Sequence, residues 1–502
     1  MTNVLVVMTD QQTAASTLPG SHGRASTPHL DRFARDAVTF SRAYSTAPHS
    51  CPARASFFTG LYPSEHGVWN NVAVTNALSR GTRPGTPFWS DELGAAGHDL
   101  AFAGRWVVSN HESPADRGWR ELIVFPPMPG LPDDEEKARR TARDRDAARL
   151  PAHRDREPGE IVRPGFPRYR HYGVDEDPYE DAAVVERACG FLADRAGDPT
   201  PWVLYVGTFG PHEPYTPPQR FLDLYDPDEI VLPPSFDDPM DDKPALYRRT
   251  RDRFDQLTEA EHRETLRHYL AFCSYQDELF GRLLAALEAS GAAQDTVVVF
   301  TSDHGEQAGD HGLWLKGLAA FLSAYHVPLV IGGPGVTRRG TVDATVSLID
   351  VGPTLLELCG AGPGRAVSGR SLGPVLRGET DRFRDDLFLQ CNGNEAYGIQ
   401  RILVHEGWKL VMNLFDYDEL YDLGADPHEM HNLLAPARPA GRRVGRAPLA
   451  EVPPELRDRL RGLYARLWRL CLDHDDDVLN HYVLTALSPF GPGVAFDRQE
   501  QT

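Results

Sequence analysis

The sequence predicts an α/β protein with two parts: a large domain whose central mixed sheet lies between layers of helices, and a smaller C-terminal α+β domain with a short antiparallel sheet. Short apolar runs rich in valine alternate with helical patterns through the first two thirds of the 502 residues, which is typical of strands alternating with helices. The runs are continuous, as expected for strands covered on both faces. After about residue 375 the pattern changes, so we predict domains at 1–375 and 376–502.

The strands of the large domain are predicted from four apolar runs, which cover Val4 to Met8, Trp202 to Val206, Thr296 to Phe300 and Val327 to Ile331. Ligands of such sheets gather at the carboxyl ends of the strands. Polar residues follow the first three of these runs, namely Asp10, His212 and the pair Asp303-His304. They are therefore candidates for one shared site.

The smaller domain is predicted from three short runs and one helical pattern. The runs Ile402 to Val404, Trp408 to Val411 and Glu419 to Tyr421 indicate a small sheet, and a helix is expected from about Pro454 to Leu472. Within the large domain, residues of about 133–157 are dense in Asp, Glu, Arg and Lys and contain few large apolar positions. We expect an exposed inserted segment there.

Composition and charge exclude several classes of function. The formal net charge of -20 gives no basic surface for nucleic acid and would repel an anionic membrane. The chain runs straight into its first apolar stretch without a basic leader, and no apolar run is long enough to span a membrane. We therefore expect a cytoplasmic protein. The six cysteines have neither framework nor CxxC spacing, and most of them are expected to be small buried apolar residues.

The most informative segment runs from Ser50 to Gly60 and reads Ser-Cys-Pro-Ala-Arg-Ala-Ser-Phe-Phe-Thr-Gly. A serine near an arginine is weak evidence by itself, but this segment resembles the signature C/S-x-P-x-R followed by T-G of the sulfatase family, within the alkaline phosphatase superfamily. Further motifs occur in the family's order, at Asp303-His304-Gly305, Leu348-Ile349-Asp350 and Glu419 to Leu423. The resemblance extends from Val4 to about Leu433 and implies a catalytic domain with an alkaline-phosphatase-like fold.

The resemblance implies an unusual nucleophile at Ser50. In the family the first motif residue is oxidised to formylglycine by a maturing enzyme, and the hydrated aldehyde attacks sulfur or phosphorus. A gem-diol can expel sulfate by collapsing back to the aldehyde, whereas an ordinary serine would form a slowly hydrolysed ester. Counting back from Pro52 and Arg54 assigns this role to Ser50 and not to Cys51. If Ser50 stays serine, phosphoryl transfer is the better hypothesis, and a bland alternative is that Ser50 only caps a helix.

The resemblance also implies one divalent metal ion, held by Asp10, Gln11, Asp303 and His304. Oxygen ligands favour calcium, magnesium or manganese, and family precedent indicates Ca²⁺ first, with Mn²⁺ or Mg²⁺ as alternatives. Many sulfatases have Asp-Asp at the first pair. Gln11 therefore removes one negative charge from the predicted site, as in the branch that includes phosphonate monoester hydrolases and choline sulfatases.

Five further residues match functional positions of the family. Arg54 is expected to hold the nucleophile or a substrate oxygen, and Lys316 to contact the transferred group. His212 is expected to protonate the leaving oxygen. Arg105 keeps a positive charge where typical members have lysine, and Asn71 resembles an asparagine near the nucleophile in the phosphonate hydrolase branch, although it can also simply cap a turn.

Two departures weaken a simple arylsulfatase interpretation. Val107 stands where typical members have a histidine that steadies the formylglycine diolate, and His326 stands where many have arginine. The leading hypothesis is a metal-dependent sulfuric ester hydrolase acting on a small anionic ester. The alternatives are a phosphonate monoester hydrolase or phosphodiesterase using the same site, and a degenerate member that binds without turnover.

Overall fold

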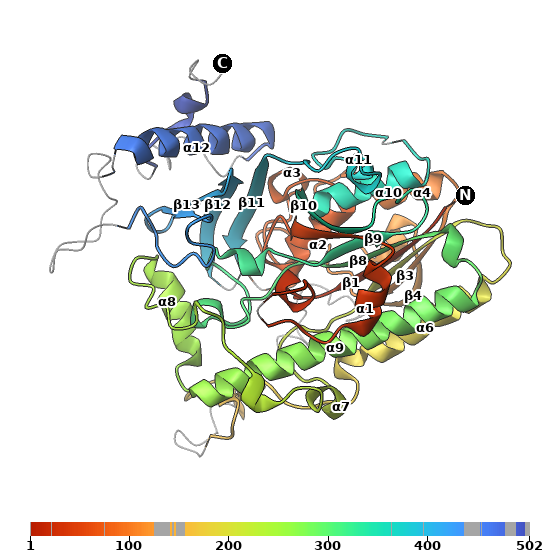
Figure 1. Ribbon diagram of the computed structural model, residues 1–502, viewed down its shortest axis with the longest axis horizontal. Coiled ribbons are helices and arrows are strands. Elements are labelled where there is room, and N and C mark those ends of the chain that lie inside the picture. The colour runs from red at the N-terminus through yellow and green to blue at the C-terminus, as the bar shows by residue number, and fades with distance from the viewer. Residues whose placement is uncertain are drawn as a thin grey trace.

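The structure is a computed structural model of the chain, shown in Figure 1. It describes residues 2–21, 23–74, 76–124, 141–142, 145–146, 156–362, 364–394, 396–435, 452, 454–476 and 488–496. The charged insertion predicted at about 133–157 lies outside these residues, except for 141–142, 145–146 and 156–157.

The central sheet contains eight strands within the described part of the chain. Their order is β10 (Gly340–Ser347), β2 (Val38–Tyr44), β9 (Leu329–Gly332), β8 (Thr296–Ser302), β1 (Asn3–Thr9), β7 (Trp202–Gly207), β3 (Asp99–Gly104) and β4 (Arg120–Val124). Only β9 pairs antiparallel with its two neighbours, and the other pairs are parallel. The predicted mixed sheet is confirmed, and the four apolar runs correspond to β1, β7, β8 and β9.

Helices cover both faces of this sheet (Figure 1). One layer contains α2 (Ser50–Thr59), α4 (Trp89–Ala95), α10 (Val351–Leu358) and α11 (Gly373–Leu376), and the other contains α1 (Pro28–Ala34), α6 (Asp181–Asp194) and α9 (Glu259–Ala289). Alternate residues of β1 enter the two layers: Val4 and Val6 pack in the core with α2, whereas Leu5 and Val7 pack with α6 and α9. Burial on both faces explains why this strand is an unbroken apolar run.

A separate antiparallel sheet follows in the C-terminal region, as predicted. Its order is β11 (Asp386–Gly393), β12 (Tyr397–His405), β13 (Trp408–Asn413) and β14 (Glu419–Asp422). Helix α12 (Pro454–Asp473) covers this sheet and packs Leu463 and Trp468 against Leu403 and Leu410. The remaining elements are short, namely α3 (Pro63–His66), α7 (Gln219–Leu222), α8 (Ala245–Arg251), β5 (Glu160–Ile161), β6 (Tyr169–Arg170) and several 3-10 turns.

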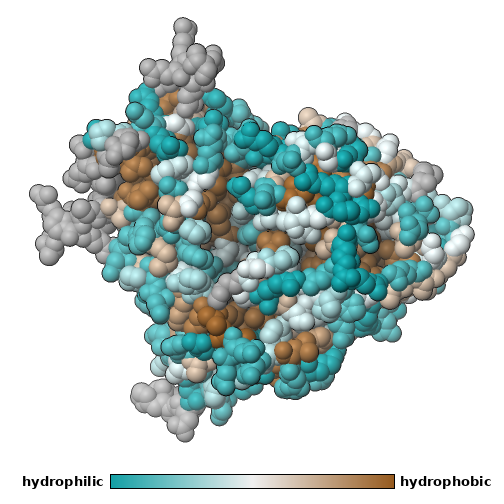
Figure 2. Space-filling model, in the orientation of Figure 1, coloured by the Kyte–Doolittle hydropathy of each residue, from teal (hydrophilic) through white to brown (hydrophobic). Residues whose placement is uncertain are grey.

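The exterior of the molecule is mostly polar, in contrast to the apolar cores on both faces of the central sheet. Figure 2 shows hydrophilic residues over much of the visible face, with hydrophobic areas in the recesses between them. Among the described helices, none combines the length and the apolar character that crossing a bilayer requires. All six cysteines are free thiols, and Cys51, Cys273, Cys391 and Cys471 are buried.

Candidate active site

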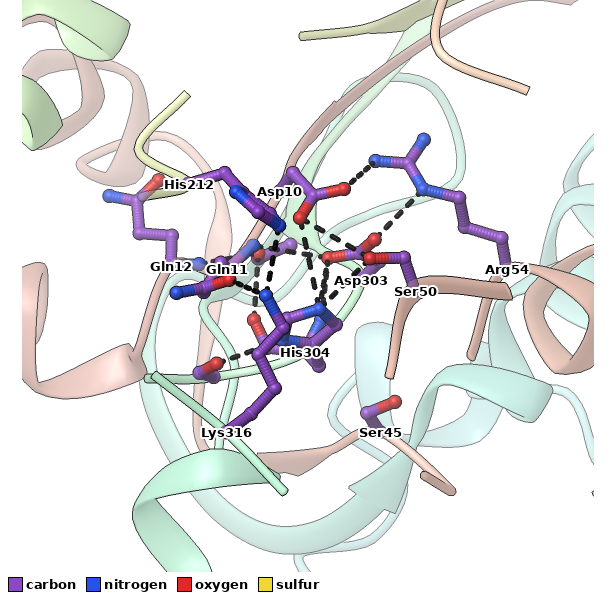
Figure 3. Close-up of polar contacts among 12 residues, drawn as sticks. Asp10, Gln11, Gln12, Ser45, Ser50, Arg54, His212, Asp303, His304 and Lys316 are labelled. Atoms are coloured by element: carbon purple, nitrogen blue, oxygen red, sulfur yellow. Dashed lines mark hydrogen bonds and ion pairs between the residues drawn. The ribbon is translucent and has the colours of Figure 1, made fainter. Parts of the chain in front are cut away.

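The candidate site forms where four neighbouring parallel strands end. In the sheet order β8, β1, β7, β3, each strand is followed by predicted site residues, namely Asp303 and His304, Asp10 and Gln11, His212, and Arg105. The carboxyl ends of parallel strands lie at one edge of a sheet, so residues far apart in sequence meet there. Figure 3 shows the side chains of Asp10, Asp303 and His304 directed toward one another beside Ser50, with Gln11 and His212 next to them.

Ser50 is the first residue of α2, a helix whose ten residues are all buried. Its Oγ lies 3.1 Å from His304 Nε2 and 3.4 Å from Asp10 Oδ1. The next residue, Cys51, packs in the apolar core, where burial raises the pKa of its thiol to about 11. The helix therefore directs the serine, not the cysteine, into the polar cluster.

Asn71 lies at the start of the same helix. Its Oδ1 accepts a hydrogen bond from the backbone N–H of Cys51 at 3.1 Å. This N–H is one of the donors that an α-helix leaves without a partner in its own first turn. Asn71, which lies in a loop that follows α2 in the sequence, thus caps the N-terminus of this helix. The N–H group that its side chain binds belongs to Cys51, the residue after Ser50.

Arg54 joins the two carboxylates at the centre of the site. The buried guanidinium donates through Nε to Asp303 Oδ2 at 2.8 Å and through Nη2 to Asp10 Oδ2 at 3.1 Å. Its Nη1 donates to the Arg105 carbonyl and to the Tyr205 hydroxyl, both at 2.9 Å. Burial acts to raise the pKa of Asp10, but the charges of Arg105 and Arg54 outweigh it and hold that pKa well below its usual value.

The two carboxylates and His304 form a set that can hold a divalent cation. One ligand atom from each of Asp10, Asp303 and His304 lies within 4.8 Å of the others. His304 Nδ1 donates to the Gly305 carbonyl at 2.9 Å, which leaves the Nε2 lone pair directed at the Oδ1 atoms of Asp10 (3.7 Å) and Asp303 (3.8 Å). Burial lowers the pKa of His304 to about 3, so the imidazole is neutral, as a metal ligand must be.

Gln11 lies beside this set and is oriented by Glu306. The Gln11 Nε2 donates to Glu306 Oε2, so the amide oxygen is directed into the site, where it accepts from Lys316 Nζ. Glu306 is fully buried and also accepts the backbone N–H groups of Ala308 and Leu315, the residue before Lys316. Sequence reasoning missed Glu306. A carboxylate two residues after His304 was the available signal.

His212 and Lys316 form the opposite side of the site. His212 Nδ1 donates to the Glu213 carbonyl at 2.8 Å, and its Nε2 lies 2.9 Å from Lys316 Nζ. The same ammonium lies 3.3 Å from Glu213 Oε2. Burial lowers the pKa of His212 to about 4. A neutral imidazole therefore accepts a hydrogen bond from the lysine.

Arg105 contributes a guanidinium that has an N–H donor without a hydrogen-bond partner among the described residues. Its guanidinium stacks 3.8 Å from the centre of the Phe209 ring, and its Nε lies 3.1 Å from Asp10 Oδ2. Its Nη1 is buried and has no hydrogen-bond partner in the described part of the chain. Buried donors are normally paired, so this atom is suited to an oxygen of a bound anion.

The two departures noted in the sequence have different surroundings. Val107 packs against the apolar core and brings no polar atom to the site. His326 donates from Nε2 to the Ser41 carbonyl at 2.8 Å and stacks on Tyr44 with ring centres 4.9 Å apart. The His326 side chain therefore supports the chain beside β2 and lies outside the cluster around Ser50.

Comparisons with known proteins agree with this geometry. Residues 2–361 match the family model for Sulfatase, and residues 309–441 match that for the C-terminal part of N-sulphoglucosamine sulphohydrolase. The chain is 29% identical to a choline-sulfatase of Rhizobium meliloti over 86% of this chain and 82% of that protein. It is 30% identical to the uncharacterized sulfatase YidJ of Escherichia coli, over 86% and 83% respectively.

The fold has similar solved structures as well. A phosphonate monoester hydrolase from Silicibacter pomeroyi superposes with a TM-score of 0.71 at 25% identity, over 96% of this chain and 97% of that one. The family match covers well over half of the chain and includes every predicted site residue. The chain therefore belongs to the sulfatase family of hydrolases, in the alkaline phosphatase superfamily.

Proposed function

We propose that this protein hydrolyses sulfuric esters, with a formylglycine formed from Ser50 as the nucleophile. The observation that carries the proposal is the position of Ser50, whose Oγ lies within 3.4 Å of both Asp10 and His304 at the buried start of α2. Arg54 fixes both carboxylates, so the cluster is rigid before substrate binds. A prearranged polar site of this kind favours transfer of a charged group.

The proposed reaction has two steps. One hydroxyl of the hydrated formylglycine gives its proton to the carboxylate of Asp10, whose Oδ1 lies 3.4 Å from Ser50 Oγ, and attacks sulfur. The bond between sulfur and the ester oxygen breaks, and that oxygen takes a proton from His212 and leaves as an alcohol. The remaining hydroxyl then gives its proton to His212, the C–O bond to the sulfate breaks and the aldehyde is restored; Asp10 releases its proton to solvent, and water hydrates the aldehyde for the next cycle. This route cleaves the C–O bond of the intermediate and needs no second attack on sulfur.

The charged side chains have separate parts in this scheme. Lys316 and Arg105 bind oxygens of the sulfuryl group, because Lys316 Nζ contacts Gln11 and the buried Nη1 of Arg105, whose Nε lies 3.1 Å from Asp10 Oδ2, has no partner among the described residues. His212 delivers the proton to the leaving oxygen. It is neutral in the free enzyme but touches the Lys316 ammonium at 2.9 Å, from which it can receive a proton as the leaving oxygen becomes basic.

We assign the metal position to Asp10, Gln11, Asp303 and His304, with Ca²⁺ as the first choice and Mn²⁺ or Mg²⁺ as alternatives. Three oxygen donors and one imidazole suit hard divalent cations. Each carboxylate binds Arg54 through Oδ2, and the two Oδ1 atoms lie on the side of His304 Nε2, at 3.7 and 3.8 Å from it. A cation bound there would supply positive charge beside the nucleophile and the sulfuryl oxygens.

Mass spectrometry of the peptide that contains Ser50, from protein purified from the native host, tests the nucleophile. Loss of two hydrogens at Ser50 together with turnover of an aryl sulfate would support the proposal, and Ser50→Ala should then abolish turnover. The matched control is Cys51→Ala, because Cys51 lies in the core beside Ser50. Unmodified Ser50 in an active enzyme would exclude the formylglycine route.

A second candidate is hydrolysis of phosphonate monoesters or phosphodiesters at the same site. The pair Asp10-Gln11 favours it, because this pair resembles that of the branch with phosphonate monoester hydrolases, and so does the similarity to a phosphonate monoester hydrolase. Comparing kcat/KM for an aryl sulfate and an aryl phosphonate separates the two. A metal-loaded, formylglycine-containing protein that turns over neither ester would instead support a binding role.

A further inference from the structure

A buried carboxylate outside the cluster, Asp181, holds the loop that carries His212. Asp181 is the first residue of α6 and is 1% exposed. Its Oδ1 accepts the backbone N–H of Phe209 at 2.7 Å, and its Oδ2 accepts that of Gly210 at 2.8 Å. Gln276 Nε2 adds a third bond to Oδ2 at 3.0 Å. Among the described residues no Lys or Arg forms a salt bridge with Asp181, and its hydrogen-bond donors are the two loop N–H groups and the Gln276 amide.

The loop bound by Asp181 reaches three groups of the active site. The Phe209 carbonyl accepts the backbone N–H of His212 at 3.2 Å, and the Gly210 carbonyl accepts the backbone N–H of Asp10 at 3.2 Å. The Phe209 ring supports the guanidinium of Arg105 at 3.8 Å and lies 5.0 Å from the His212 ring. A shift of the Phe209–Gly210 peptide would therefore move His212 and Arg105 together.

The packing around the loop leaves it few alternative positions. A Cβ on Gly210 would lie 2.2 Å from Gln276 Nε2 and 2.4 Å from the Phe272 ring, so only glycine fits there. The other face of Phe209 is covered by Tyr179, whose ring centre is 4.2 Å away and whose hydroxyl donates to the Glu213 carbonyl. In this close packing, a carboxylate that accepts two consecutive N–H groups determines where the peptide lies.

We propose that Asp181 is a positioning residue for the reaction: through Phe209 and Gly210 it sets His212 against the leaving oxygen and Arg105 over the reacting group. This rests on the proposed function, in which His212 is the leaving-group acid. Asp181 touches neither substrate nor cluster. Its effect on catalysis should therefore follow that of His212, and should be largest where protonation of the leaving group matters most.

The informative variant is Asp181→Asn, which keeps the size of the side chain. An amide has one acceptor oxygen, so its NH₂ must face either the Phe209 or the Gly210 N–H, and two donors repel. The matched control is Asp277→Asn. Asp277 is also buried and accepts two consecutive backbone N–H groups, from His29 and Leu30, but it supports α1 and does not contact the loop.

The experiment compares kcat/KM for two esters of whichever acid the wild type hydrolyses, one with an alkyl and one with a 4-nitrophenyl leaving group. If Asp181→Asn misplaces the acid, kcat/KM for the alkyl ester should fall by roughly 100-fold. For the aryl ester it should fall by less than about tenfold, because that leaving group needs little protonation. His212→Ala provides the reference pattern. Asp277→Asn should leave the ratio between the two esters at the wild-type value.

The outcomes separate the inference from the proposed function. If Asp181→Asn and His212→Ala share the same leaving-group dependence, the inference is supported. If His212→Ala shows the dependence but Asp181→Asn lowers both esters equally or neither, the positioning role is wrong. If His212→Ala shows no dependence, the acid assignment itself is wrong and the inference fails with it. Should Asp181→Asn not fold, Gln276→Leu removes one bond to Asp181 and must give a smaller loss with the same preference, or the inference fails.

Discussion

Replacing Arg54 by methionine should destabilise the metal-free protein far more than the loss of a surface arginine. The guanidinium is fully buried and is the hydrogen-bonded partner of both Asp10 and Asp303. Methionine fills similar space but leaves two carboxylates close together without the cation between them. Removing one partner of a buried ion pair costs about 3–5 kcal/mol, because the remaining charge stays desolvated.

This cost translates into a measurable shift of the melting temperature. Unfolding entropies of about 2.1 cal/mol/K per residue give roughly 1 kcal/mol/K for 502 residues. In chelator, Arg54→Met should therefore melt about 3–5 °C below the wild type by differential scanning fluorimetry. Saturating Ca²⁺ or Mn²⁺ should reduce the difference, because a bound cation would partly neutralise the same carboxylates.

The control is Arg32→Met, which breaks an ion pair with Glu288 of 2.8 Å in which both side chains are 61% exposed. Exposed pairs contribute about 0–1 kcal/mol, so this variant should melt within about 1 °C of the wild type. If Arg54→Met melts like the control in chelator, the two carboxylates do not depend on Arg54. The electrostatic account of the site given above would then be wrong.

Asp303→Asn should weaken Ca²⁺ or Mn²⁺ binding, measured by calorimetry. The loss of affinity should exceed the roughly 10–100-fold that is typical when a residue hydrogen-bonded to a metal ligand is removed. Unchanged affinity would show that Asp303 is not a ligand. Lys316→Met should lower kcat by roughly 100–1,000-fold with an unchanged circular dichroism spectrum, and a change confined to KM would contradict a role in the transition state. Burial raises the pKa of Asp277 from 3.8 to about 6, so the folded protein binds more protons than the unfolded chain between these values and the wild type loses stability as pH rises through them. The stability of Asp277→Asn relative to the wild type should therefore rise by about 2.4 kcal/mol between pH 4 and 7, and parallel melting curves would refute this.

The sequence predicted the centre of the fold better than its margins. The four apolar runs found β1, β7, β8 and β9 because these strands are buried on both faces. The edge strand β10 and its neighbour β2 were missed, since their burial alternates or is interrupted and their sequences GTVDATVS and VTFSRAY mix polar with apolar residues. A half-exposed strand next to a sheet edge gives no continuous signal.

The candidate site shows a similar division. Residues that lie next to predicted strand ends or within a motif could be named from the sequence, as for Asp10, Ser50 and Asp303. Asp181 could not, because it acts by accepting N–H groups of another segment, and for Glu306, which accepts from Gln11, the sequence offered only its position two residues after His304. Such contacts depend on which loops pack together in the folded chain. The sequence alone does not distinguish a carboxylate that becomes buried from one that stays on the surface.

The local charges explain why charge alone does not choose between a sulfate and a phosphonate. Asp10, Asp303, Glu213 and the neighbouring Glu306 bring four carboxylates to the site, and Arg54, Arg105 and Lys316 bring three cations. A divalent cation would therefore leave one excess positive charge, which matches a substrate monoanion. Sulfate monoesters and phosphonate monoesters both carry one negative charge, but the sulfuryl group has three free oxygens, whereas a phosphonate has carbon in place of one. With Lys316 on one oxygen and a cation on another, the unpaired Nη1 of Arg105 gains a partner only if the third atom is oxygen. Because a buried donor left without a partner is costly, we expect Arg105 to favour turnover of the sulfate ester over that of the phosphonate ester.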